Sequence, residues 1–395
     1  MTKPFPLGAR NPFEFGRELG PDELVDREPE LAAIERVAAR RGKLFFIGPR
    51  RYGKTSILNA VEQRLTARGA VVLRYDAEAF ESLTLLAQAL LTGAARKLTG
   101  PVAKASGVIG KFFTKLRPDV SYDLGDQKIT VRLGTTDGGG SRSAELPVLT
   151  EVLDGIERMA KGHKKPVVVI LDEFQQVVSE GGEAAERQIR AAIQKHRHVA
   201  YVFAGSKTRL LADLSGHPGR AFWKLGERRF LGPVPREDFR LFLGRGFGSV
   251  GFKTTPEGIE RILDAAEDVP YNVQRLASEC WERLRVKDDR VLTAGAVEEA
   301  LRSVVASENP AYAQIWTNLT RAQKSALKAV IEEKGTGLLG RVVLHRVGLA
   351  ASTMQRALEG LGALGIVRQD EAAGAIRFRL EDPFFAAWLA AAQGQ

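Results

Sequence analysis

The stretch LFFIGPRRYGKTSIL, from Leu44 to Leu58, constrains the fold of this chain more than any other. It places a glycine-rich loop between a run of apolar residues and a helical pattern. Glycines at 48 and 53 let the backbone turn tightly and direct N–H groups at phosphate oxygens. A helix that starts near Lys54 adds its positive end. The stretch predicts a strand, a phosphate-binding loop and a helix, with these nucleotide-contacting residues: Gly48, Pro49, Arg50, Arg51, Tyr52, Gly53, Lys54, Thr55 and Ser56.

Such a loop needs a carboxylate at the end of a neighbouring strand, and PVVVILDEFQQV supplies one. Asp172 follows five apolar residues, so we expect it to hold Mg²⁺ together with Thr55, while Lys54 reaches the phosphates. Glu173 is placed to activate water as a general base. The alternative is that both acids only cap a strand-to-helix turn. Ser206 follows the strand in VAYVFAGSKTRLL and is a candidate γ-phosphate sensor, or else a turn residue.

Strands and helices alternate up to about residue 234, which predicts a parallel α/β sheet covered on both faces. Residues 100–145 interrupt this rhythm as an insertion, with a hairpin around Gly125-Asp126. Beyond Pro235 the strands are expected to stop. The expected strands are 44–47, 71–75, 167–171, 199–204 and 229–231, and the expected helices are 56–67, 83–91, 146–160, 184–195, 236–247, 256–267, 271–286 and 294–306.

From Thr320, an expected N-cap, the pattern becomes three helices and a hairpin, which predicts a winged helix. Ser352 is expected to cap its third helix. We therefore divide the chain into a P-loop ATPase domain (1–234), a helical lid (235–318) and a winged helix-turn-helix domain (319–395). The candidate DNA-binding residues are Gln355 and Arg356 on the third helix and Arg368, Arg377 and Arg379 in the wing.

The net charge of +10 favours an acidic partner only weakly. The winged domain either contacts double-stranded DNA or docks on protein. The basic segment 104–117 is a second DNA candidate, or else an insert helix packed on the sheet. Cys280, the sole cysteine, excludes an internal disulfide and is expected to be buried. No apolar run is long enough for a membrane span, so we expect a cytoplasmic protein. His196 and His198 are expected to face apart on a helix and to bind no metal.

These segments together resemble the archaeal-type ATPase family, within the STAND and AAA+ group of P-loop ATPases. The resemblance rests on NPFEFG, LVDREPEL, IGPRRYGKTSIL, VVVILDEFQQV, FAGSKTRLLADL, GRAFWKLGERRFLGPVP, VPYNVQRLASECW and LEDPFFAAWL. It implies that Val25, Asp26 and Arg27 lie against the adenine and that Pro270 starts a lid helix facing the nucleotide. The family usually has Gly-x-Pro there, whereas this chain has Asp268-Val269-Pro270.

Fast phosphoryl transfer also needs an arginine near the transferred group. Arg220 is a candidate, as are the pair Arg228-Arg229 and Arg275. The sequence therefore predicts a Mg²⁺-dependent ATPase that binds ATP and ADP and works as a nucleotide-driven switch associated with DNA. The alternatives are a signalling ATPase acting through protein contacts and homo-oligomerisation, and a nucleotide-binding scaffold that does not hydrolyse ATP.

Overall fold

The computed structural model describes residues 10–20, 23–98, 117–123, 128–134, 145–206, 208–287, 289–372 and 375–393. The chain divides into two compact units. The sheet unit comprises residues 18–232, and the helical unit combines the residues up to 17 with 233–395. The division into three domains expected from the sequence stays a prediction.

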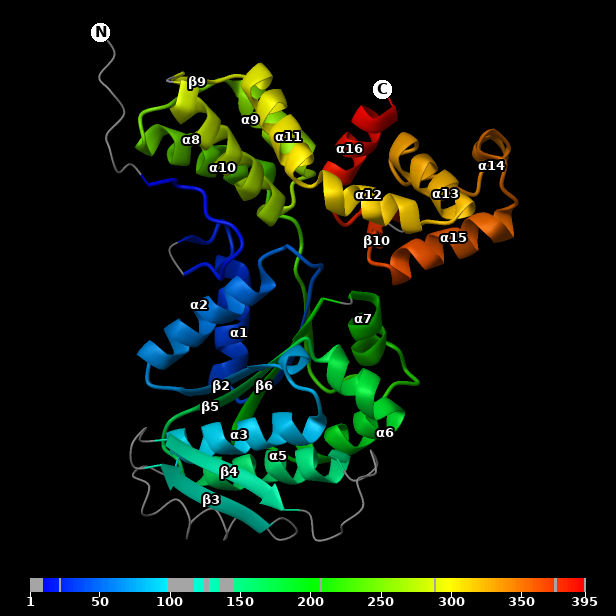
Figure 1. Cartoon of the computed structure of the whole chain (residues 1–395). Coiled ribbons are helices and arrows are strands. Elements are labelled where there is room, and N and C mark those ends of the chain that lie inside the picture. Colours follow the sequence, from blue (N-terminus) through cyan, green and yellow to red (C-terminus); the bar gives the residue numbers. More distant parts are fainter. Residues whose placement is uncertain are drawn as a thin grey trace. The chain divides into compact units, whose positions relative to one another are not determined.

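A five-stranded parallel sheet forms the centre of the sheet unit, in the order β2-β5-β6-β1-β7 (Figure 1). The predicted parallel α/β fold is therefore confirmed. The strands of this sheet are β1 (Lys43–Ile47), β2 (Val71–Asp76), β5 (Val167–Asp172), β6 (Val199–Gly205) and β7 (Glu227–Phe230). The helices are α1 (Glu28–Ala39), α2 (Lys54–Ala67), η2 (Ala77–Ala79), α3 (Leu83–Leu98), α5 (Glu145–Lys161), α6 (Gln175–Ile193) and α7 (Thr208–Gly216).

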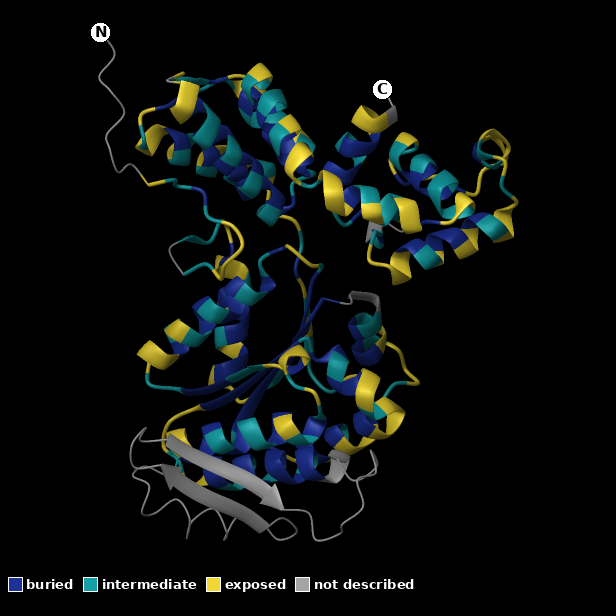
Figure 2. Cartoon of the chain, in the orientation of Figure 1, coloured by how far each residue is buried: buried dark blue, intermediate teal, exposed yellow. Residues whose placement is uncertain are grey.

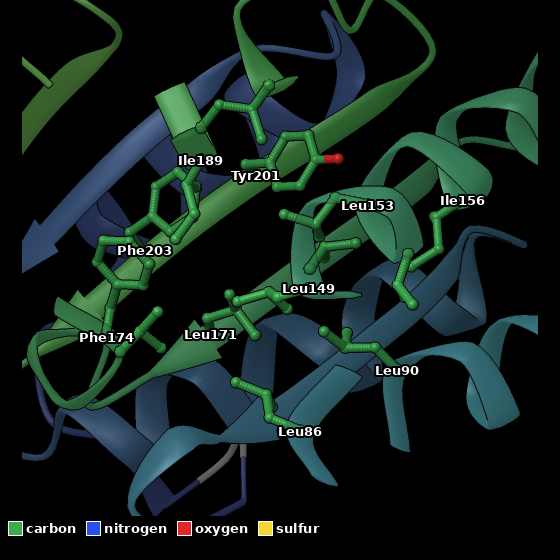
Figure 3. Close-up of a cluster of buried hydrophobic side chains, with 14 of the residues drawn as sticks. Leu86, Leu90, Leu149, Leu153, Ile156, Leu171, Phe174, Ile189, Tyr201 and Phe203 are labelled. Carbon is green, nitrogen blue, oxygen red and sulfur yellow. The ribbon is translucent and has the colours of Figure 1, made fainter. Parts of the chain in front are cut away.

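Alternate residues of each strand enter two different layers, because successive side chains of a strand point to opposite faces. Tyr201 and Phe203 of β6 pack with Leu86 and Leu90 of α3 and with Leu153 of α5 in one cluster (Figure 3). Helices α1 and α2 cover the other face (Figure 1). Strands β1, β5 and β6 are buried on both faces (Figure 2), which explains their almost uninterrupted apolar sequences, whereas the edge strand β7 is partly exposed.

The insertion contains an antiparallel hairpin of β3 (Arg117–Asp123) and β4 (Lys128–Gly134), and β4 contacts α3. This confirms the strands of the predicted hairpin, whose turn lies outside the described residues. The basic segment 104–117 also lies outside them, except for Arg117. Helix α6 begins nine residues before the predicted start at 184 and has a kink at Gly182, whose φ is 60°.

The helical unit contains helices α8 to α16 and two short sheets. Its elements are α8 (Arg236–Ser249), β8 (Lys253–Thr254), α9 (Pro256–Ala266), α10 (Pro270–Lys287), β9 (Val291–Leu292), α11 (Ala294–Ser307), α12 (Asn309–Asn318), α13 (Arg321–Glu332), α14 (Arg341–Val347), α15 (Ala351–Ala363), β10 (Val367–Ala372), β11 (Ala375–Leu380) and α16 (Phe384–Gln393). The parallel pair β8–β9 corrects the expectation that strands stop at Pro235, because two extended residues before each of two helices pair side by side.

The NPFEFG segment packs on the helical unit. Asn11 donates a hydrogen bond of 2.9 Å to Oγ of Ser278, and the backbone N–H of Glu14 donates to Gln274 at 3.1 Å, both on α10. The ring of Phe13 lies 4.6 Å from that of Phe247. The described residues before Arg17 therefore belong with α8 and α10 rather than with the sheet.

Two capping predictions differ in outcome. Thr320 forms a reciprocal capping box with Gln323 at the start of α13, as expected. Ser352 does not cap α15, because that helix already starts at Ala351 and its N-cap is Ala350, which has no side-chain hydrogen bond.

The sequence predicted that His196 and His198 lie on a helix. This prediction is wrong, because α6 ends at Ile193 and both histidines follow it. His196 is buried, with Nε2 at 2.8 Å from Asp154 and Nδ1 at 2.8 Å from the Tyr201 hydroxyl. His198 bonds Glu157 at 2.7 Å. Both histidines thus have structural partners. Cys280 is buried as expected, and burial raises the pKa of its thiol.

Candidate functional site

The loop from Gly48 to Gly53 adopts a shape that its glycines permit. Gly53 is left-handed, with a φ of 83°, and immediately precedes α2. A Cβ atom on Gly48 would lie 2.6 Å from Cβ of Leu231, so only glycine fits beside that residue. Arg51 is also left-handed, with a φ of 68°. In the rest of the loop Tyr52 is buried, Arg50 and Arg51 are exposed, and Pro49 is intermediate.

Four polar side chains predicted from two separate segments meet beyond the carboxyl ends of β1 and β5. Nζ of Lys54 lies 3.0 Å from Oε1 of Glu173 and 3.6 Å from Oδ1 of Asp172. The Thr55 hydroxyl donates to Oδ2 of Asp172 at 3.2 Å. The carboxyl ends of parallel strands are where open α/β sheets bind their ligands. The fold therefore gathers the loop and both acids into one site.

Both carboxylate oxygens of Glu173 accept hydrogen bonds, Oε1 from Lys54 and Oε2 from Ser206. The Ser206 hydroxyl donates to its Oε2 at 2.8 Å, and the Ser206 backbone N–H donates to the same atom at 3.2 Å. Its own backbone is left-handed, with a φ of 46°. Burial raises the pKa of Glu173, but the charge of Lys54 and hydrogen bonds from Gln175, Lys54 and Ser206 outweigh it and leave the pKa lowered. Glu173 is thus an ionised, oriented carboxylate at neutral pH.

Sequence reasoning missed two polar residues beside this site. The Gln175 side-chain amide donates to Oε2 of Glu173, and its own Oε1 is buried without a hydrogen-bond partner. Asp76 ends β2 and is paired in register with Asp172. Burial, followed by the charges of Asp172 and Glu173, raises the pKa of Asp76. A signal for Asp76 was available, because this acid directly follows the predicted strand VVLRY just as Asp172 follows its own predicted strand.

Arg27 does not direct its charged group outward. It is 5% exposed, and its guanidinium donates to the carbonyl of Tyr52 at 3.4 Å and to that of Gly232 at 3.2 Å. Burial lowers the pKa of Arg27. Asp26 beside it is left-handed, with a φ of 42°. Arg27 therefore ties the phosphate-loop backbone to the last residue of the sheet unit. The adenine contact expected of Val25, Asp26 and Arg27 stays a prediction.

Ser56 and Asn59, both on α2, form hydrogen bonds with the backbone at the N-terminal end of the sheet unit. The Leu19 backbone N–H donates to Oγ of Ser56 at 3.0 Å, and Asn59 donates to the Leu19 carbonyl at 3.3 Å. Leu19 is the second residue of the sheet unit. Ser56 thus has a backbone partner within the protein.

Two of the four candidate arginines, Arg220 and Arg275, are paired with glutamates. Arg220 forms a two-bond ion pair with Glu186 of α6, a carboxylate that is 2% exposed. Arg275 belongs to the helical unit, where it pairs with Glu308. Arg228 is exposed, and Nε of Arg229 is buried without a hydrogen-bond partner. Pro270 is the first residue of α10. Their roles toward a nucleotide stay predictions.

The wing arginines are engaged within the helical unit. Arg368 is bonded to Asp370 at 3.2 Å and to the Leu380 carbonyl at 3.2 Å. Arg377 donates to the Lys334 carbonyl at 2.9 Å. Arg379 lies 3.2 Å from Asp370 and 3.5 Å from Glu267. These arginines hold the wing to its surroundings, whereas Gln355 and Arg356 on α15 are exposed.

Comparisons with known proteins agree with this architecture. A family model described as an AAA domain matches residues 38–211, and one described as a probable winged helix domain matches residues 310–391. The chain is thus a P-loop protein with an AAA domain and a C-terminal winged helix domain, consistent with an archaeal-type AAA+ ATPase. A search of the curated proteins finds no match.

Among solved structures, a Walker-type ATPase of Pyrococcus abyssi is similar over 96% of this chain and 99% of its own, with a TM-score of 0.61 and 16% identity. The ORC2 protein of Aeropyrum pernix, solved in ADPNP–ADP complexes, is similar over 98% of this chain and 99% of its own, with a TM-score of 0.53 and 14% identity. At these identities the similarity establishes the fold.

Among the described residues no helix is both long enough and apolar enough to cross a membrane.

Proposed function

We propose that this protein binds ATP with Mg²⁺ at the loop 48–55, hydrolyses it to ADP and phosphate, and uses the change of nucleotide as a switch. The observation that carries the proposal is the convergence of Lys54, Thr55, Asp172 and Glu173, with Ser206 orienting Glu173. These residues come from the β1–loop–α2 segment and from the ends of β5 and β6. Such a convergence favours a binding site over the alternative that both acids only cap a strand-to-helix turn.

The donor set fits a nucleotide and its metal. A hydroxyl and a carboxylate 3.2 Å apart, at Thr55 and Asp172, are hard oxygen ligands of the kind that Mg²⁺ prefers. Gly48 and Gly53 have no side chain, so the loop backbone at these two positions can approach phosphate closely. When bound, Mg²⁺ would neutralise charge that develops on the phosphate oxygens. Thr55 and Asp172 are the residues that would hold it.

Glu173 supplies the base. Water oxygen attacks the γ-phosphorus, the bond from that phosphorus to the bridging oxygen of ADP breaks, and Oε1 of Glu173 takes the proton of the water. Oε1 is the atom that Lys54 contacts, so moving the Lys54 ammonium onto phosphate frees it. Ser206 and Gln175 keep Oε2 fixed during this change.

The test is Mg²⁺-dependent ATP turnover by the full chain and by Glu173→Gln. We expect the variant to bind ATP but to lose roughly 10²- to 10⁴-fold in turnover, as for loss of a general base. Glu180→Gln is the matched control, since Glu180 is an exposed acid on α6 that bonds Gln176. Turnover of Glu173→Gln at the wild-type rate, or turnover that persists with chelator, contradicts the proposal.

For the output of the switch, we propose contact with double-stranded DNA through the winged helix domain. The exposed Gln355 and Arg356 on α15 favour this, and α15 is the third helix of the fold. The alternative output is nucleotide-dependent self-association or protein binding. Turnover measured with and without duplex DNA, beside light scattering in ATP and in ADP, separates the two outputs.

A further inference from the structure

Helices α12 and α13 present a cationic surface that the sequence reasoning did not single out. We define the Trp316 patch as Trp316, Arg321, Lys324 and Lys328. Lys324 and Lys328 lie over the Trp316 ring, with Nζ at 5.3 and 5.9 Å from its centroid. Arg321, Lys324 and Lys328 are three and four residues apart, so they share one face of α13. The patch therefore combines three positive charges with one aromatic ring.

Among the described residues, no acidic side chain pairs with the cations of this patch. Residues 309–331 contain no acidic residue at all. Within the described part of the chain, Arg321, Lys324 and Lys328 form no salt bridge. The acids at either end are engaged elsewhere: Glu308 pairs with Arg275, and Glu332 and Glu333 pair with Arg346. Asp382, on the neighbouring segment, accepts a hydrogen bond from Tyr312.

The other face of α13 explains why the basic residues stay at the surface. Ala326, Leu327, Ala329 and Val330 are buried and fix the orientation of the helix. Arg321 is exposed, while Trp316, Lys324 and Lys328 are half-buried. The ring of Trp316 supports the two lysine side chains by a cation–π interaction, which positions their ammonium groups beside it.

We infer that the Trp316 patch binds the phosphate backbone of duplex DNA independently of base sequence. Unpaired Lys and Arg side chains on one helix face neutralise phosphates, and such contacts dominate affinity without reading bases. A membrane fits less well, because none of the exposed large apolar side chains among the described residues lies on α12 or α13. The wing fits less well too, since Arg368, Arg377 and Arg379 already hold other groups. The inference rests on the proposed DNA contact but not on ATP hydrolysis.

The test is the salt dependence of duplex DNA binding by the full chain, followed by fluorescence anisotropy of a labelled duplex. The three patch cations contribute about −2.7 to the log–log slope, or roughly 40-fold weaker binding at 200 mM than at 50 mM salt, in addition to any contact by Arg356. For Lys324→Gln/Lys328→Gln we expect the slope to be less steep by about 1.8, so that the same rise in salt weakens binding roughly 12-fold less than in the wild type. Lys195→Gln/Lys253→Gln, which removes two exposed lysines elsewhere, should keep the wild-type slope. Thermal unfolding checks that every variant is folded.

Three results overturn the inference. One is an unchanged slope in Lys324→Gln/Lys328→Gln together with binding lost in Gln355→Ala/Arg356→Ala, which assigns the contact to α15. Another is equal competition by anionic vesicles or polyglutamate, which makes the patch a general polyanion surface. The third is an absence of duplex binding by the wild-type chain. ATP turnover without DNA is measured on the same samples, so loss of hydrolysis alone rejects the enzymatic proposal and leaves the patch standing.

Discussion

The ammonium of Lys54 lies 3.0 Å from the carboxylate of Glu173, and both side chains are largely buried. This pair joins the loop that grips phosphate to the acid that we propose as the base. Lys54 also faces Asp172 at 3.6 Å, so one cation lies between two carboxylates and offsets one of their two negative charges. Without Lys54, both carboxylates would lose this cation.

Lys54→Met should destabilise the sheet unit and change its response to acid. Removing one partner leaves buried carboxylates unpaired, which costs roughly 3 kcal/mol. The native pKa of Glu173 is lowered in the wild type, so its contribution to stability is present above the unfolded pKa and is lost as pH falls. In the variant, burial without Lys54 raises that pKa. The gap in unfolding free energy between the two proteins should therefore narrow from pH 7 toward pH 4.5, as urea unfolding would measure. A gap that widens on acidification contradicts this.

Arg27→Met should lower stability by about 1–3 kcal/mol, because two buried carbonyls, those of Tyr52 and Gly232, lose their donor. Arg27→Lys should recover part of the loss, since it restores a cation but not both bonds. Arg68→Met is the control, because Arg68 pairs with Glu35 at the surface and should change stability by less than about 0.5 kcal/mol. Thermal unfolding compares the three. Equal effects of Arg27→Met and Arg68→Met would show that the two carbonyl bonds contribute nothing.

Gly48→Ala should destabilise the sheet unit by about 1–3 kcal/mol, because its Cβ would lie 2.6 Å from Cβ of Leu231. In the double variant Gly48→Ala/Leu231→Ala the strain should remain, because the clashing atom of Leu231 is its Cβ, which alanine keeps. Gly244→Ala on α8 is the control, because no heavy atom lies within 4 Å of its added Cβ and a helix favours alanine over glycine. Chemical denaturation measures the free energy of unfolding of Gly48→Ala, of the double variant with Leu231→Ala, and of Gly244→Ala. Rescue by Leu231→Ala would place the clash elsewhere.

His196 should make the sheet unit sensitive to mild acid. Burial lowers its pKa despite the hydrogen bond to Asp154 and the charges of Glu157 and Asp154. A lowered pKa means that the folded chain keeps His196 neutral. Its contribution to stability is therefore complete above the unfolded pKa of about 6.5 and is lost as pH falls through the lower native value. We expect His196→Asn to have a flatter profile of unfolding free energy between pH 7 and 5. An identical profile in both proteins assigns the acid sensitivity to other groups.

The sequence predicted those site residues that follow directly from a local strand pattern. The loop 48–55, Asp172 and Ser206 each lie at the end of an apolar strand, and the sheet collects strand ends at one edge. Arg27 could not be read in this way, because its partners Tyr52 and Gly232 are 25 and 205 positions distant. The wing arginines were predicted as DNA contacts from their place in the expected hairpin, yet Arg379 lies beside Glu267, 112 positions earlier. Partners of long side chains depend on which surfaces meet, and spacing along the chain does not encode that.

Residue pattern alone therefore determined the parallel sheet, the phosphate-binding loop, the carboxylate pair and the winged helix, because each depends on backbone periodicity over a few residues. Only tertiary structure decided which charges stay available. It joined Lys54 to Glu173 across 119 positions, engaged the wing arginines internally, and placed Lys324 and Lys328 beside Trp316, where neither lysine forms a salt bridge with a described residue. The physical reason is that hydrogen bonds and ion pairs form between groups brought close by packing, so the free cations of a surface are those that packing has not paired.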